Sequence, residues 1–561
     1  MDRRAFLRGA GAAGASTLLA LVAAACGRGG PARPVPTTSL AGRRSTRGGV
    51  REVDGLRVAD WLVEENAHRA RTRKWIIPRK VVGAESPSIE GFIDKVSAVA
   101  GEELTLYVNT VAASFRAYVY RVGYYGGYGG RLIAQSPELR GTQQPTPHFT
   151  AGVNLVECRW SPSWRVQVGD HWPPGSYLIR LEGAPDQQQY VPFVVRDDAS
   201  EATYLVQSSV TTWQAYNPYG GYSLYGGPGQ NSLANRSRVV SFDRPYGHDR
   251  TALDARGSGD FLGNELPFIF LAERLGLDLT YWTDVDLHEQ PALLAKHRCL
   301  ISLGHDEYWS TPMRDAVEAG IEKGLNVAFL GANACYRQIR LEASPTGGNR
   351  RVICYKDAAA DPIAKADPAL ATGSSWATDL VSRPESSLTG VMYQAYGANA
   401  PLVVANAASW VFAGTGLKDG SRLSSGGKQD LVGSEFDGYE PGLHQPPGHE
   451  VEILAHSPVQ GVTGSGYSDM AYYSVPGGGG VFATGTASWV TSLWDAPPGT
   501  VNRLGLGVGK AAAPLASITV NVLRVFGAGP ADERHPSATN WRHFYSPGAK
   551  FGPSVDVVPT R

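Results

Sequence analysis

The chain lacks an excess of charge of either sign, because its 561 residues include 52 basic and 52 acidic side chains. No basic surface is therefore expected, and nucleic acid is excluded as a partner. The sequence also lacks the short motifs of several common enzyme classes. It has no G-x-S-x-G, no H-E-x-x-H, no P-loop, and no G-x-G-x-x-G after a predicted strand. Any chemistry must rest on a less familiar arrangement.

Cysteine is scarce, with five residues in the whole chain. None of the four cysteines after Cys26 belongs to a C-x-x-C pair, which excludes a zinc ribbon and a thioredoxin motif. Cys299 lies in an apolar run and is predicted to be a buried small hydrophobe. Cys335 and Cys354 could pair in an oxidising compartment, and the sequence leaves that pairing open.

Residues 1–26 have the features of an export signal. Arg3-Arg4 forms a twin-arginine pattern, and the apolar run 15–25 is too short to span a membrane. Cys26 follows three alanines, as in a bacterial lipobox, although Leu is more usual at the position of Ala23. We therefore expect export by the twin-arginine route. The product would be lipid-anchored through Cys26 at the outer face of the cytoplasmic membrane, or cleaved and secreted.

The remaining length exceeds one hydrophobic core, so more than one domain is expected. Residues 27–48 are rich in Gly, Pro, Arg, Ser and Thr and are predicted to be a linker. Residues 49–85 form an N-terminal extension that the patterns do not assign. We predict a β-sandwich domain over residues 86–198 and an α/β domain over residues 199–561.

Short runs of alternating polarity, separated by Gly- and Pro-rich turns, support the β-sandwich. The clearest are 104–108, 115–120, 176–181 and 191–195.

Strands and helices alternate after residue 200. Apolar runs at 204–207, 278–282, 299–303 and 326–330 are predicted strands. Helical spacing appears at 266–275, 292–296 and 313–323, and a late helix is predicted at 517–526. Such alternation is typical of βαβ units and indicates a parallel sheet.

Polar side chains follow three of these strands directly. Tyr216 comes after the strand at 204–207, His305 and Glu307 after 299–303, and Asn333 after 326–330. The carboxyl ends of parallel strands share one edge of a sheet, so these side chains are expected to meet in one crevice.

Each of these residues also has a plain structural explanation. His305 could bond the backbone, Glu307 could cap the next helix, Asn333 could serve a turn, and the tyrosines could pack together. A second chemical alternative is nucleophilic catalysis by Cys335 with His305 as its base.

Several segments resemble the large subunit of N,N-dimethylformamidase and its relatives. The resemblance runs from about residue 85 to the carboxyl terminus, with the motifs in the family's order. It rests on these segments: Thr212–Gly221 (TWQAYNPYGG), Ser241–Tyr246 (SFDRPY), Gly304–Trp309 (GHDEYW), Gly331–Asn333 (GAN) and Gly433–Asp437 (GSEFD). It implies an all-β immunoglobulin-like sandwich followed by a glutamine-amidotransferase-like α/β domain with a parallel sheet.

The resemblance also implies a mononuclear iron, Fe³⁺, held by two tyrosines and one glutamate. By motif the metal ligands are Tyr216, Tyr246 and Glu307, and Tyr219 and Tyr308 are the alternative tyrosines. Phenolate and carboxylate oxygens are hard anionic donors that suit ferric iron.

The catalytic residues implied by the same resemblance are His305, Asn333, Glu435 and Lys356. His305 would orient the metal-binding glutamate, Asn333 would hold the substrate, and Glu435 would move protons. The match at Lys356 is the poorest.

The expected function is that of an exported amidohydrolase acting on linear amide C–N bonds, with a small-molecule or envelope amide as substrate. The family's known enzyme is cytoplasmic and has a separate small subunit, whereas this chain has an export signal and no segment resembling that subunit. A homo-oligomer is compatible with the sequence. The alternative is a non-catalytic cell-envelope lipoprotein that binds a ligand or carbohydrate in its aromatic crevice.

Overall fold

The computed structural model describes residues 49–77, 88–184, 187–229, 234–247, 260–425, 429–443, 446, 450–462, 464–494 and 512–545. All of them lie within one compact unit, Ser39–Arg561. The predicted export signal, Cys26 and the linker at 27–48 fall outside the described residues. None of the helices described is both long enough and apolar enough to cross a membrane.

The N-terminal extension forms a small hairpin and a helix. Strand β1 (Val50–Val53) pairs antiparallel with β2 (Leu56–Ala59), and α1 (Asp60–Asn66) follows directly. Leu56, Val58 and Leu62 are buried in the main hydrophobic core. The extension is therefore packed onto the rest of the protein.

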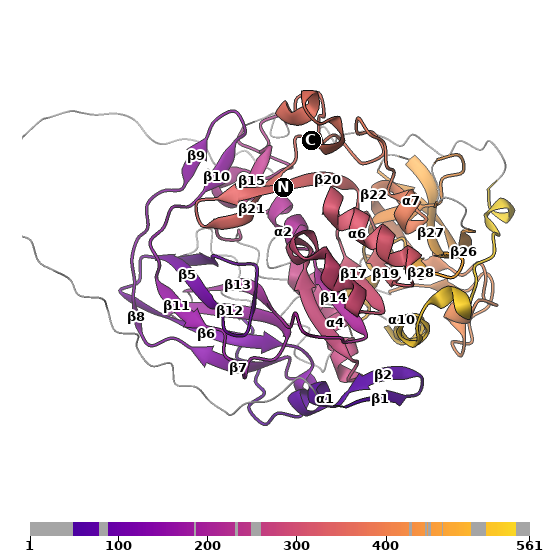
Figure 1. The fold of residues 1–561 in the computed structure, drawn as a ribbon, viewed down its shortest axis with the longest axis horizontal. Helices are drawn as coiled ribbons and strands as arrows, with labels where there is room; N and C mark the ends of the chain where they lie inside the picture. Colours follow the sequence, from indigo (N-terminus) through magenta and orange to yellow (C-terminus); the bar gives the residue numbers. More distant parts are fainter. Residues whose placement is uncertain are drawn as a thin grey trace, which may run out of the picture. The chain divides into compact units, whose positions relative to one another are not determined.

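The next hundred residues form several antiparallel sheets, as the alternating runs predicted. One sheet has the order β11-β5-β3, and a larger one contains β4-β13-β12-β6-β7 (Figure 1). Buried side chains of both sheets share one cluster that includes Leu104, Val166, Ile179 and Phe193, so the sheets pack face to face. The strands are β3 (Ile89–Ile93), β4 (Ser97–Val99), β5 (Glu103–Thr110), β6 (Ser114–Val122), β7 (Gly130–Gln135), β11 (Trp164–Gln167), β12 (Gly175–Ala184) and β13 (Gln187–Arg196).

A seven-stranded, mostly parallel sheet forms the centre of the remaining chain. Its order is β16-β14-β17-β19-β28-β27-β26, and β27 is the strand that runs antiparallel to both of its neighbours (Figure 1). The predicted parallel sheet is thus confirmed for its first four strands. The strands are β14 (Tyr204–Ser208), β16 (Leu279–Thr283), β17 (Cys299–Gly304), β19 (Asn326–Gly331), β26 (Glu452–Gly461), β27 (Gly464–Ser474) and β28 (Gly480–Ala483).

Helices α4 (Leu266–Arg274), α6 (Thr311–Glu322) and α10 (Ala512–Ala528) of this part lie where the sequence patterns predicted helices. The other described α-helices of this part are α2 (Val210–Tyr216), α5 (Asp284–Glu289), α7 (Ser386–Thr389) and α8 (Trp489–Ser492). The segment Pro291–Lys296 is a 3₁₀ helix. The remaining strands are β8 (Leu139–Arg140), β9 (His148–Thr150), β10 (Leu155–Glu157), β15 (Val239–Ser241), β18 (Tyr308–Ser310), β20 (Arg337–Ser344), β21 (Gly347–Ile353), β22 (Met392–Ala400), β23 (Leu402–Val403), β24 (Arg422–Leu423) and β25 (Val432–Gly438).

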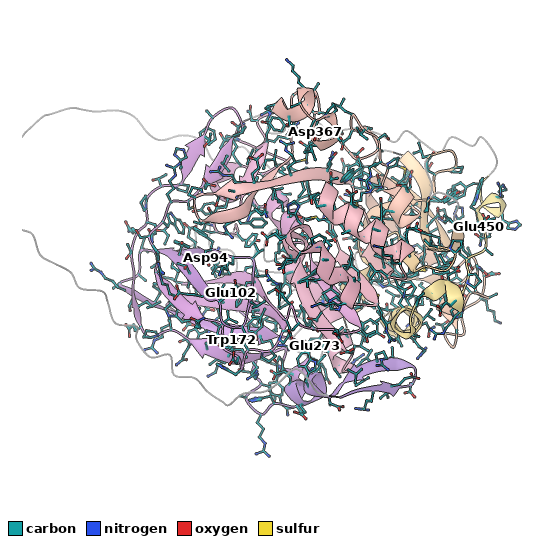
Figure 2. The ribbon with its side chains drawn as sticks, in the orientation of Figure 1. Asp94, Glu102, Trp172, Glu273, Asp367 and Glu450 are labelled. Atoms are coloured by element: carbon teal, nitrogen blue, oxygen red, sulfur yellow. The ribbon has the colours of Figure 1, made fainter. Side chains whose placement is uncertain are left out.

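A buried ion pair joins the antiparallel sheets to the α/β part. Arg121 of β6 and Glu273 of α4 (labelled in Figure 2) lie 2.6 Å apart, and both side chains are 0% exposed. Tyr281 of β16 also donates a hydrogen bond to Glu273, at 2.8 Å. Removing either charge would leave its partner buried and uncompensated, so this contact couples the two regions.

Candidate active site

Strand β17 ends at the group of side chains that the sequence singled out. Gly304, with φ of 59°, closes the strand, and a Cβ there would collide with Asn264. Asp306 then fixes the turn, because its two oxygens accept hydrogen bonds from Gln207, Ser302 and Trp309. The backbone N–H of Glu307 donates to the hydroxyl of Thr212 at 3.0 Å, which ties this turn to α2.

Two tyrosines meet the two carboxylate oxygens of Glu307. Tyr216 Oη donates to Oε2 at 2.7 Å, and Tyr225 Oη donates to Oε1 at 2.5 Å. The two rings stack with their centroids 4.3 Å apart. Glu307 itself is fully buried. Two phenol hydroxyls and one carboxylate, groups whose oxygen atoms bind hard metal ions, therefore lie together.

Tyr225 occupies the place that the sequence assigned to Tyr246. The ring of Tyr246 packs against Trp213, with centroids 6.3 Å apart, and none of the contacts found among the described residues joins it to Glu307. Tyr219 points elsewhere too, because its hydroxyl donates to Glu90 at 3.0 Å. Tyr308 lies edge-on to both stacked rings, and its buried hydroxyl has no partner. Of the four tyrosines named from sequence, the structure thus brings Tyr216 to Glu307 through its hydroxyl.

Sequence reasoning missed Tyr225 because four tyrosines crowd one glycine-rich loop. The structure selects it by local turns. Gly220 has φ of 72° inside the 3₁₀ turn Tyr219–Gly221, and Ser223 Oγ then accepts hydrogen bonds from the backbone N–H groups of Tyr225 and Gly226. These turns aim the Tyr225 side chain at Glu307.

His305, Glu435 and Asn333 form a second connected group beside Glu307. His305 Nε2 lies 3.1 Å from Glu435 Oε2 and 3.4 Å from Glu307 Oε2. Asn333 Nδ2 donates to Glu435 Oε2 at 3.1 Å. Glu435 arrives on β25, which pairs with β22 outside the seven-stranded sheet. The structure therefore brings together His305, Asn333 and Glu435, three of the residues that the sequence predicted to be catalytic.

Lys356 and Arg337 are the basic side chains beside this group. Lys356 Nζ lies 3.2 Å from the centroid of the Tyr225 ring, and it is buried without a hydrogen-bond partner. Arg337, which sequence reasoning did not find, donates to Glu307 Oε1 at 3.2 Å. Its position at the start of β20 carries no motif, so only the fold reveals it.

The shared burial of these groups perturbs their titration. Burial, together with the charge of Glu307, raises the pKa of Tyr216 and of Tyr225 well above the ordinary value. Burial works against the charged form of His305, yet Glu435 and Glu307 raise its pKa to about 10. Burial would raise the pKa of Glu435, and the neighbouring His305 lowers it below the ordinary value. The histidine and Glu435 thus favour an ion pair in the free protein.

The donor set fits a hard, trivalent metal ion. Two phenol hydroxyls meet the oxygens of one carboxylate; Glu307 is fully buried, and Tyr216 and Tyr225 are half-buried. Among the described residues, no group of three or more His, Cys, Asp or Glu is arranged to hold a metal. A metal at this edge of the sheet would depend on the tyrosines.

The cysteines do not support nucleophilic chemistry. Cys335 lies in the hydrophobic cluster around α6 with Trp309 and Met313, and burial raises the pKa of its thiol to about 12. None of the contacts found among the described residues joins it to His305. Cys335 and Cys354 are both buried and free, so they form no disulfide.

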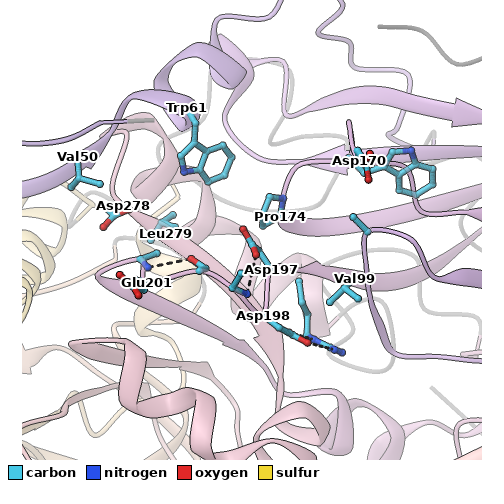
Figure 3. A pocket seen from close by; sticks show the side chains of 16 residues that line it. Val50, Trp61, Val99, Asp170, Pro174, Asp197, Asp198, Glu201, Asp278 and Leu279 are labelled. Atoms are coloured by element: carbon cyan, nitrogen blue, oxygen red, sulfur yellow. Dashed lines mark hydrogen bonds and ion pairs between the residues drawn. The ribbon is translucent and has the colours of Figure 1, made fainter. Parts of the chain in front are cut away.

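A separate cavity of about 830 Å³ lies near the first residues of β14 and β16 (Figure 3). Those are the amino ends of parallel strands, whereas Glu307 follows a carboxyl end. The cavity is lined by Trp61, Trp172 and several carboxylates and is distinct from the Glu307 group: the acidic residues are Asp170, Asp197, Asp198, Glu201 and Asp278.

A mixed, mostly parallel sheet whose strand ends gather tyrosines, a glutamate and a histidine is what the resemblance implied. Comparison with family models shows that the chain belongs to the N,N-dimethylformamidase beta subunit-like family, with its C-terminal model matching residues 116–501.

Two curated relatives are the N,N-dimethylformamidase beta subunits of Paracoccus aminophilus and of an Alcaligenes species. They are 24% and 23% identical to this chain over 427 and 428 residues. Each alignment covers 62% of this chain and 54% of the relative. The chain therefore spans about half the length of the relatives it matches.

Proposed function

We propose that the protein is a hydrolase that cleaves linear amide C–N bonds at an iron site formed by Tyr216, Tyr225 and Glu307. The observation that carries this proposal is the approach of both phenol hydroxyls to the two oxygens of one buried carboxylate. Three anionic oxygen ligands would balance the charge of Fe³⁺ and leave positions for water and substrate. Membership in the family supports the same chemistry.

When bound, iron would supply a positive charge that polarises an amide carbonyl and makes water more acidic. The side chains of this chain supply the remaining steps. Arg337 holds Glu307 in place through its 3.2 Å hydrogen bond. Glu435 accepts a proton from the attacking water and returns it to the leaving amine nitrogen. His305 bridges Glu435 and Glu307 and keeps both carboxylates oriented.

The resemblance supports finer proposals on the fold, and the N-terminal sequence supports one on location. We propose that the antiparallel sheets form an immunoglobulin-like sandwich and that the α/β part is glutamine-amidotransferase-like. Export by the twin-arginine route, with a lipid anchor at Cys26, follows from the N-terminal pattern. An envelope amide would then be a natural substrate.

Metal analysis of the protein purified from its native compartment tests the central proposal. We expect about one iron per chain and a visible phenolate-to-iron absorption band, both lost in Glu307→Ala, together with amine release from simple amides. A folded wild-type protein that is colourless, free of metal and inactive on amides would overturn the proposal. In that case a ligand-binding role would become the better explanation.

A further inference from the structure

One polar atom beside the site is buried with nothing to bond. Asn333 is 3% exposed, and its Oδ1 atom accepts no hydrogen bond. The other half of the same amide is engaged, because Nδ2 donates to Glu435 Oε2 at 3.1 Å. An unpaired buried acceptor is costly, so this atom is suited to receive a donor from a bound molecule.

The orientation of this amide is fixed by its neighbours. Exchanging Oδ1 and Nδ2 would set an amide oxygen against a carboxylate oxygen of Glu435, and two acceptors cannot bond each other. The backbone is held as well. Asn333 has φ of 58°, and its N–H donates to Asp437 Oδ1 at 2.8 Å. The free oxygen is therefore presented in one direction on a rigid support.

The amide group of Asn333 lies beside the proposed reaction site. Its Nδ2 lies 3.5 Å from His305 Nε2, and His305 in turn lies 3.4 Å from Glu307. A substrate whose carbonyl faces the Glu307 group would have its amide nitrogen nearby. An N–H on that nitrogen could donate a hydrogen bond to Asn333 Oδ1, whereas an N-alkyl group there would leave this acceptor unpaired.

We propose that the site selects primary and secondary amides, which carry an N–H, over N,N-dialkyl amides, and that Asn333 Oδ1 is the atom that discriminates. This inference rests on the proposed function in taking an amide as the ligand. It goes beyond that function by defining the substrate class. Amides with an N–H differ from N,N-dimethylformamide, the N,N-dialkyl amide that appears in the names of the two relatives.

The test uses three probes on the full chain: acetamide, N-methylacetamide and N,N-dimethylacetamide. Binding is measured by saturation-transfer NMR, and turnover by release of ammonia or amine. We expect the two N–H amides to bind and react about 10-fold or more better than the dialkyl amide, because an unpaired buried acceptor costs about 1–3 kcal/mol. Equal binding and turnover of all three would overturn the inference and leave the proposed hydrolase intact.

Variants identify the responsible atom. Asn333→Gly tolerates the positive φ and removes the amide, so the preference should fall to about 2-fold or less. Asn333→Asp keeps an acceptor oxygen and should keep the preference, although its charge faces Glu435 and lowers overall turnover. The matched control is Asn349→Gly, at a half-buried asparagine with φ of 51° whose side chain bonds Glu289 outside the site, and it should behave as the wild type.

The outcomes separate the two proposals. A binding preference that persists without turnover would overturn the hydrolase and support the role of Asn333. A preference that survives in Asn333→Gly would overturn that role, whatever the enzyme does.

Discussion

Tyr225 Oη and Glu307 Oε1 lie 2.5 Å apart although 82 positions separate the two residues in the chain. This contact changes the set of proposed metal ligands from the one that motifs suggested. Tyr216 brings a second hydroxyl to the other oxygen of the same carboxylate. The geometry therefore favours Tyr216, Tyr225 and Glu307 as the ligands, with Tyr246 outside the group.

Two matched substitutions test this choice. Tyr225→Phe removes the hydroxyl that meets Glu307, so iron content and the visible band should fall to about a tenth or less of the wild-type values. Tyr246→Phe removes a hydroxyl outside the group and should retain both. Iron per folded chain, measured by elemental analysis with circular dichroism as the folding check, decides between them. The reverse result would restore the motif-based assignment.

Glu435→Gln should separate catalysis from metal binding. The variant keeps an oxygen near His305 and Asn333 but no longer accepts a proton. We expect amide hydrolysis to fall about 10²- to 10⁴-fold, the usual range for a general base. Iron content should remain at the wild-type level, because Glu435 bonds His305 and Asn333 and is not one of the proposed ligands. An unchanged rate would remove Glu435 from the proton pathway.

Cys335→Ala addresses the nucleophile alternative. The thiol is buried among apolar side chains and its pKa is about 12, so it is not a thiolate at neutral pH. The rate of hydrolysis per folded molecule should stay within about 2-fold of the wild-type rate. Normalising to folded protein corrects for any stability lost with the buried side chain. A complete loss of turnover in a folded, iron-loaded variant would revive cysteine chemistry.

Sequence patterns predicted the sheet well because buried parallel strands are continuous apolar runs. The runs at 204–207, 299–303 and 326–330 all became neighbouring strands, and this order alone brought His305, Glu307 and Asn333 to one edge. Glu435 was found by resemblance, since it arrives on β25 from outside that sheet. Tyr225 and Arg337 had no periodic signal, because loop turns and a strand start decide where they point.

The buried ion pair of Arg121 and Glu273 should contribute strongly to the stability of the folded protein. Glu273→Gln leaves the guanidinium without its countercharge, and we expect the free energy of unfolding to fall by about 3–5 kcal/mol. The control is Glu103→Gln, whose partner Arg165 is 61% exposed, where the loss should be about 0–1 kcal/mol. Urea denaturation followed by tryptophan fluorescence measures both. Equal losses would show that burial does not set the difference.

Glu385 makes stability depend on pH. Burial raises the pKa of this carboxyl from 4.5 to about 7 in the folded protein. The folded state thus holds the proton more tightly, so this contribution is fully present below about pH 4.5 and is lost as pH rises towards 7. The loss amounts to up to about 3 kcal/mol.

Glu385→Gln stays neutral at all pH values, so the variant should gain stability relative to wild type as pH rises from 4.5 to 7. Denaturation at pH 5 and pH 8 gives the two differences. A constant difference would contradict the raised pKa.

The ion pair between β6 and α4 also bears on how the chain can be divided. Cutting the chain near residue 200 would leave Arg121 in one fragment and Glu273 in the other. Each buried charge would then lose its countercharge. Such fragments would be poor material for crystallisation or antibody production. The antiparallel sheets are therefore best kept together with the α/β part whenever the protein is expressed or engineered.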